Sequence, residues 1–179
     1  MLPRVQLLSL VTASLASPLP LEARGGICEP LGRICYGAAY GTSQNLNESD
    51  IKYVAQFLRH HGRNYEALFT VASGFTCREW AFGIPGSGTV LVLAKHVDPR
   101  VNSSVSFEDI ANTIDGGENA SKDDRAGSIL GCGNTGGSRG VQVNSTSSVY
   151  NTDDYRNSHA LPRGIIVKLV RQDDSDPEE

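Results

Sequence analysis

Apolar residues recur at helical spacing in three segments, and each segment begins after a residue type that caps helices. The first spans 50–61, has Asn47 or Ser49 as its cap and ends at Gly62. The second runs from Ser106 to the glycines 116–117, and the third from Ser121 to Gly131. In both later segments an aspartate follows the serine by three residues, as at a capped helix start. The buried stripes comprise Ile51, Val54, Ala55, Phe57 and Leu58, then Ile110, Ala111 and Ile114, then Ala126, Ile129 and Leu130.

The remaining apolar and aromatic runs predict strands. We expect strands over 68–76 and 78–84, a turn at 85–88, and a final buried strand over 165–170. The segment 140–143 alternates as a half-buried strand does. The segment 89–97 is the most apolar of residues 25–179, and its pattern leaves open a buried strand or a short buried helix. Together the elements predict an α+β fold, a small sandwich with helices on one face of a mainly antiparallel sheet.

The two ends of the chain have the composition of segments outside the folded domain. In residues 1–16, Arg4 precedes a short apolar run that ends in small residues. This arrangement is typical of a secretory signal peptide, and the alternative is a buried N-terminal helix. Residues 17–24 end at Arg24 and suggest a pro-segment, or an ordinary N-terminal tail. We expect one disulfide-stabilised domain over 25–171 and a disordered acidic tail over 172–179.

Composition and charge argue against a membrane span and against nucleic acid as a partner. The 179 residues include 39% hydrophobic residues, which is enough for a buried core. The longest apolar run is too short to span a bilayer, so we expect no membrane span. The formal charge is -4, and residues 25–171 contain equal numbers of basic and acidic side chains. This balance argues against nucleic acid as a partner.

Four cysteines, Cys28, Cys35, Cys77 and Cys132, follow the expected signal peptide and predict two disulfides. The sequence leaves all three pairings open. The alternatives are a metal site or a nucleophilic Cys132; the absence of closely spaced cysteine pairs argues against zinc, and we expect no metal and no cofactor. Four Asn-x-Ser/Thr sequons predict glycosylation in a eukaryotic host, at Asn47, Asn102, Asn119 and Asn144.

Few residues suggest a catalytic or cofactor-binding site. Residues 131–136 fit G-x-G-x-x-G, but a helix is expected before them and a strand after, so a glycine-rich turn explains them better than a dinucleotide site. His60 and His61 lie where a helix ends, which favours a structural role. Glu79, His96 and Arg78 have the side-chain types of a secreted ribonuclease, with Glu and His as base and acid. Trp80, the only tryptophan, is either a core residue or a sugar-stacking platform, and the core is favoured.

The chain resembles the small secreted cysteine-containing proteins of filamentous fungi, many of which are candidate effectors. The resemblance rests on the N-terminal segments, the four cysteines, and the stretches 77–80, 93–96, 108–117 and 164–170. It implies a role outside the cell, often in the interaction with a host, and it implies no catalytic residues.

From these observations we expect a secreted, effector-like or toxin-like protein, and we favour a binding protein over an enzyme. Its partner would be a host protein or a cell-wall glycan, and we expect a monomer. A ribonuclease-type hydrolase that uses Glu79, His96 and Arg78 is the first alternative. A structural cell-wall or glycan-binding protein is the second.

Overall fold

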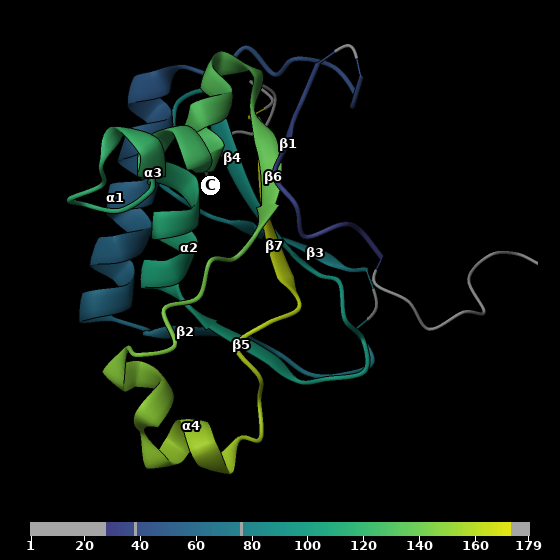
Figure 1. The fold of residues 1–179 in the computed structure, drawn as a ribbon, viewed down its shortest axis with the longest axis vertical. Helices are drawn as coiled ribbons and strands as arrows, with labels where there is room; N and C mark the ends of the chain where they lie inside the picture. Colours follow the sequence, from purple (N-terminus) through teal and green to yellow (C-terminus); the bar gives the residue numbers. More distant parts are fainter. Residues whose placement is uncertain (1–27, 38, 76, 173–179) are drawn as a thin grey trace, which may run out of the picture.

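The computed structural model of the protein describes residues 28–37, 39–75 and 77–172 (Figure 1). The expected signal peptide, pro-segment and acidic residues 173–179 therefore lie outside the described residues. A five-stranded sheet has the order β1-β6-β7-β4-β3, and every neighbouring pair is antiparallel. These strands are β1 (Ile34–Cys35), β3 (Glu79–Phe82), β4 (Val90–His96), β6 (Gly137–Gly140) and β7 (Ile165–Arg171). A second, two-stranded sheet pairs β2 (Leu68–Val71) with β5 (Ser103–Ser106).

Helices α1 (Glu48–Asn64) and α2 (Phe107–Asp115) pack side by side against one face of the five-stranded sheet (Figure 1). The Asn47 side chain caps α1, and the Ser106 side chain accepts a hydrogen bond from Asp109 N–H to cap α2. The helix α2 ends at Gly116, whose φ of 90° suits glycine. The shorter helices are α3 (Lys122–Gly127), η2 (Ile129–Thr135), η3 (Ser148–Asn151) and α4 (Asp153–Asn157). The expected α+β class, with a mainly antiparallel sheet and helices against it, is confirmed.

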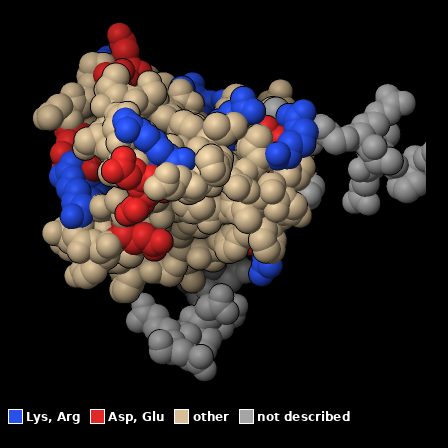
Figure 2. All heavy atoms as spheres, turned by 90° about the horizontal axis from the view of Figure 1, so that it is seen from below, with Lys and Arg blue, Asp and Glu red and all other residues tan. Residues whose placement is uncertain are grey.

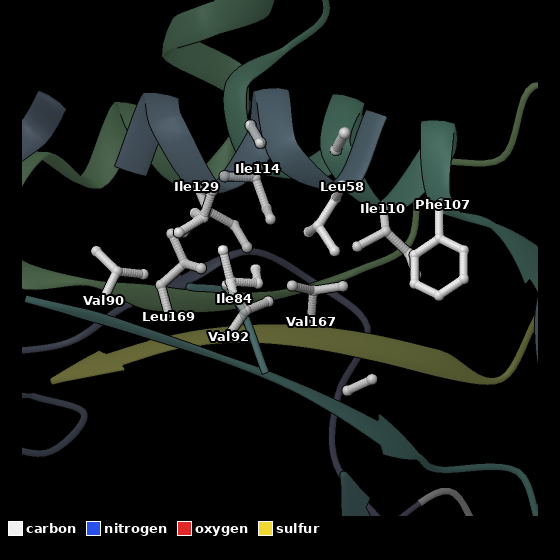
Figure 3. Packing of buried hydrophobic residues seen from close by; sticks show 14 of the residues in the cluster. Leu58, Ile84, Val90, Val92, Phe107, Ile110, Ile114, Ile129, Val167 and Leu169 are labelled. Atoms are coloured by element: carbon white, nitrogen blue, oxygen red, sulfur yellow. The ribbon is translucent and has the colours of Figure 1, made fainter. Parts of the chain in front are cut away.

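The main core lies between the two long helices and the sheet (Figure 3). In β4 every second residue is buried, beginning with Val90, which is the alternation of a strand. The segment 89–97, for which the sequence left open a strand or a helix, is therefore a strand. From the helices, Leu58, Ile110 and Ile114 point toward this face of the sheet. Each fully buried aliphatic side chain contributes roughly 1.5–3 kcal/mol, so this layer is the main source of stability.

The elements that differ from prediction are mostly strands made of small or polar residues. The strand expected over 140–143 is β6, which lies at Gly137–Gly140 instead. A Cβ on Gly137 would lie 2.4 Å from the carbonyl oxygen of Ile34, and one on Gly140 would lie 2.9 Å from Cβ of Leu31. Glycine is therefore needed where the N-terminal arm, residues 28–37, runs closely alongside β6. The strand β5 was not predicted, because three of its four residues are serines.

Two disulfides fix the irregular N-terminal arm to the sandwich. Cys28 pairs with Cys77 and Cys35 pairs with Cys132, with Cα–Cα distances of 5.7 and 5.2 Å. The prediction of two disulfides is confirmed, and the pairing that the sequence left open is settled. In the part of the chain that the structure describes, no helix is long and apolar enough to cross a membrane.

Candidate functional site

The three residues considered for ribonuclease chemistry do not come together. Glu79 lies opposite Lys95 in the β3–β4 ladder, so His96, the next residue of β4, points to the other face of the sheet. His96 is fully buried, with Nδ1 2.9 Å from the Phe75 carbonyl oxygen and Nε2 2.9 Å from Ser103 Oγ. Both ring nitrogens are therefore engaged inside the protein. This geometry places His96 in a structural role and away from Glu79.

The Glu79 carboxylate belongs to an ion-pair cluster on the sheet face opposite the helices. Lys168 Nζ lies 2.5 Å from Glu79 Oε1 and 3.0 Å from Glu29 Oε1, and Lys95 is also paired with Glu29. Burial opposes ionisation of Glu29, but the hydrogen bonds and charges of Lys95 and Lys168 outweigh it and lower its pKa. Two cations face two carboxylates here, so the cluster anchors the N-terminal arm and leaves no charge unmatched.

Aromatic side chains surround Arg78, the residue before β3, away from the ion-pair cluster. The Arg78 guanidinium carbon lies 5.9 Å from the centroid of the Phe75 ring and 5.6 Å from that of Trp80. Phe75 is 47% exposed, so much of its ring is open to solvent. Within the described residues no carboxylate lies within 4.0 Å of Arg78, in contrast to Lys95 and Lys168. We call Phe75, Arg78 and Trp80 the aromatic corner.

Trp80 is half-buried and has aromatic neighbours that the sequence does not reveal. The Phe69 ring lies 6.0 Å from it with planes 73° apart, and the Phe75 ring lies 6.4 Å from it with planes 71° apart. Phe69 comes from β2, in the other sheet, so only the tertiary fold brings it here. Because the rings stand nearly perpendicular to one another, they do not form one flat platform.

The strand that carries this corner is an edge of the five-stranded sheet. The His96 N–H donates to the Arg78 carbonyl oxygen at 3.2 Å. Because backbone groups alternate in direction along an antiparallel strand, the N–H and C=O groups of Glu79 and Ala81 point to the free edge. Glu79 and Ala81 are both exposed, and no other strand of the described chain pairs with this edge. The aromatic corner and this free edge together form the β3 surface.

The other residues noted in the sequence have structural surroundings. The segment 131–136 is a 3-10 turn that leads into β6 and contains the disulfide-bonded Cys132, so it lacks the strand-to-helix context of a dinucleotide site. His60 and His61 lie near the end of α1, and the His61 ring lies 4.8 Å from that of Phe107. Within the described residues, no three His, Cys, Asp or Glu side chains are grouped so that they could hold a metal ion.

The four sequons differ in accessibility. Asn47, Asn119 and Asn144 are exposed, and in Asn47 and Asn144 the side-chain oxygen accepts hydrogen bonds from the Ser or Thr two residues later. Asn102 is half-buried, its side-chain oxygen accepts from Ser73 N–H at 2.8 Å, and its sequon partner Ser104 is 1% exposed. Attachment of a glycan is therefore least hindered at the three exposed positions.

Charges of both signs are mixed on the face of the molecule seen from below (Figure 2). Figure 2 shows basic and acidic side chains next to one another on the face seen from below, with a broad area free of charge. A long polyanion such as RNA binds through rows of cations, and such a row is not visible on this face. No protein-family model matches this chain, and no curated protein and no solved structure is found to be similar to it.

Proposed function

We propose that the protein is a secreted, effector-like binding protein that recognises a host protein through the β3 surface. The observation that carries the proposal is Arg78, a cation without a carboxylate partner in the described chain, stacked on two aromatic rings beside a free strand edge. Arg and Trp are the residue types most enriched among the side chains that dominate protein interfaces. The two disulfides support a role in an oxidising compartment outside the cell.

The partner that fits this surface is an extended segment with an acidic side chain. Such a segment can hydrogen-bond to the outward-facing backbone groups of Glu79 and Ala81 and add a strand to the sheet. Stacking on Phe75 and Trp80 holds the Arg78 guanidinium in place, and its N–H groups can then bind a carboxylate in bidentate fashion. The exposed Phe75 ring supplies apolar contact for a neighbouring side chain.

The two alternatives receive less support from the same region. A glycan-binding site usually offers a broad ring face against which a sugar can lie, whereas the Phe75 and Trp80 rings stand 71° apart and the Arg78 guanidinium carbon lies 5.9 and 5.6 Å from their centroids. A ribonuclease needs a base and an acid that reach one substrate, and Glu79 and His96 lie on opposite faces of the sheet.

The proposal is tested by selecting displayed random peptides of about twelve residues against the folded, oxidised protein. Peptides that bind should carry an aspartate or glutamate within an alternating apolar pattern. Arg78→Gln should weaken a selected peptide about 10–100-fold, since a charge-assisted hydrogen bond contributes about 1.5–3 kcal/mol. Arg156→Gln is the matched control, because Arg156 is exposed on α4 with only a 3.9 Å ion pair.

Methylation of alternate peptide amides should abolish binding if the peptide adds as a strand. Selected peptides without acidic residues, or equal binding to the Arg78→Gln variant, would contradict the proposal. Retention on chitin or glucan in place of peptide binding would favour the glycan-binding alternative. Host tissue should respond to the folded protein but not to a reduced and alkylated sample, and equal responses would also argue against the proposal.

A further inference from the structure

A polar cleft lies between α1 and the turn that joins α2 to α3, on a different part of the molecule from the β3 surface. Its volume is about 610 Å³. The lining residues come from α1, from the end of α2 and the turn after it, from α3 and from η2: Lys52, Gln56, Arg59, Asp115, Gly117, Glu118, Asn119, Arg125 and Leu130. A cavity of this size accommodates a small molecule such as a substituted monosaccharide.

The floor of the cleft contains a guanidinium held in a fixed orientation. The Arg59 side chain is only 3% exposed. Its Nε donates to Glu108 at 3.2 Å, and its Nη2 donates to Asn112 at 3.0 Å and to Asp115 at 2.9 Å. The third nitrogen, Nη1, has no acceptor among the described residues, and Arg59 is one of the residues that line the cleft. Three acceptors therefore orient a buried cation whose remaining N–H groups are available to a ligand.

The two carboxylates that line the cleft are already paired with arginines, whereas its two rim cations are paired only weakly or not at all within the described chain. Arg59 engages Asp115, and Arg63 engages Glu118 at 2.9 Å. Arg125 has no carboxylate within 4.0 Å in the described part of the chain, and Lys52 makes only an exposed pair with Glu48. An exposed pair of this kind contributes little and is readily exchanged for a stronger partner.

We propose that this cleft binds a small ligand with an oxyanion group, such as the phosphate of a sugar phosphate or the carboxylate of a sugar acid. The oxyanion accepts hydrogen bonds from Arg59 Nη1 and interacts with Lys52 and Arg125. The amide side chains of Gln56 and Asn119 are placed to bond sugar hydroxyl groups. Because Asn119 is also a sequon residue at the rim, a glycan attached there would restrict entry to the cleft.

Calorimetric titration at low salt tests this proposal on protein made in a bacterial periplasm, which forms disulfides without N-glycans. The probes are inorganic phosphate, glucose 6-phosphate, glucuronate and neutral glucose. The first two separate a free phosphate from a sugar-borne one, glucuronate tests the carboxylate, and glucose carries no oxyanion. We expect one or both sugar anions to bind and glucose not to bind.

The double variant Lys52→Gln/Arg125→Gln should weaken the sugar anion about tenfold or more, since it removes two charged partners. Lys122→Gln is the matched control, because Lys122 is exposed on the same short helix as Arg125 but does not line the cleft. Equal weakening by Lys122→Gln would show an unspecific charge effect and overturn the proposal. Binding of none of the anions, or equal binding of glucose, would also overturn it. Arg78→Gln should leave this binding unchanged, so the cleft and the β3 surface are tested separately.

Discussion

Two neighbouring tyrosines offer a sharp test of how buried hydroxyl groups affect stability in this fold. The Tyr150 hydroxyl donates to Asp109 Oδ2 at 2.5 Å and accepts from the Ser106 N–H at 2.8 Å. Asp109 is 2% exposed and Tyr150 is 7% exposed, so neither partner has ready access to water. The Tyr155 ring lies 5.1 Å from that of Tyr150 and is also buried, but its hydroxyl has no hydrogen-bond partner in the described chain.

The two Tyr→Phe substitutions should therefore have different effects on the free energy of unfolding. Tyr150→Phe leaves a buried carboxylate oxygen and a buried backbone N–H without their partner. Each such group costs about 1–3 kcal/mol, so we expect a loss of about 2–6 kcal/mol for the two together. Tyr155→Phe removes a hydroxyl that is buried without compensation, so we expect no loss, or a gain of about 1 kcal/mol.

Urea unfolding followed by the fluorescence of Trp80, the single tryptophan, measures both changes. A loss in the lower part of this range, below about 5 kcal/mol, should leave the Tyr150→Phe variant folded, because domains of this size are usually stable by about 5–15 kcal/mol. Burial and the hydrogen bond to Asp109 also raise the pKa of Tyr150, so its ultraviolet titration should occur at higher pH than that of a free tyrosine. Equal losses in the two variants, or a larger loss for Tyr155→Phe, would refute the reasoning.

Three other substitutions or measurements test separate features of the structure. Glu29 has a lowered pKa, so its stabilising contribution is present at neutral pH and is lost as pH falls through that pKa; the stability difference between wild type and Glu29→Gln should shrink from pH 7 to pH 3. A larger difference at pH 3 would contradict this. Gly116→Ala should cost about 1–2 kcal/mol in urea unfolding, since φ is 90° there and a Cβ would lie 2.9 Å from the backbone of Asp124, and an unchanged midpoint would argue against that strain. Mass spectrometry of glycopeptides from a eukaryotic host should find Asn144 occupied and Asn102 unoccupied; the reverse pattern would show that burial does not govern occupancy.

The elements that the sequence predicts well are those whose caps, apolar pattern and end lie close together along the chain. The helix α2 has a serine cap, an apolar stripe and a glycine stop within a dozen residues, and all three appear in the structure. The apolar runs of β4 and β7 were likewise recognisable, although only the structure settled that the first is a strand. The cap of α1 proved to be Asn47 and not Ser49, because the Asn47 side chain accepts from the Ser49 N–H.

Elements stabilised by distant contacts carry no such local signal. The strand β5 is rich in serine, yet all four residues are buried, because Thr70 and His96 bond the hydroxyls of Ser104 and Ser103. The strand β6 is defined by its antiparallel pairing with the N-terminal arm, which runs close to its glycines, a contact between residues about a hundred positions apart. Propensity for strand is low in both segments, so only their tertiary surroundings make them strands.

The same distinction explains the candidate sites. Arg78, Glu79 and His96 lie close along the chain or across one ladder, but alternation sends Glu79 and His96 to opposite faces. The sequence does not predict the cleft, because Arg59 has the pattern of an ordinary charged residue of a helix. Only the fold brings Asp115 and Glu108 next to it. The one available hint was the turn at Gly116–Gly117, which brings polar residues after α2 back beside α1.

The distribution of satisfied and unsatisfied charge indicates which surfaces are available for binding. On the sheet face opposite the helices, Lys95 and Lys168 are each paired with a glutamate, so a ligand there would have to break existing ion pairs before gaining its own. At the aromatic corner and at the rim of the cleft, Arg78 and Arg125 have no carboxylate partner within the described chain. A ligand with an acidic group gains a charge-assisted bond at these places without such a loss. Under the two proposals, acidic partners bind at two separate surfaces, and the charged cluster around Glu79 is the least available of the three.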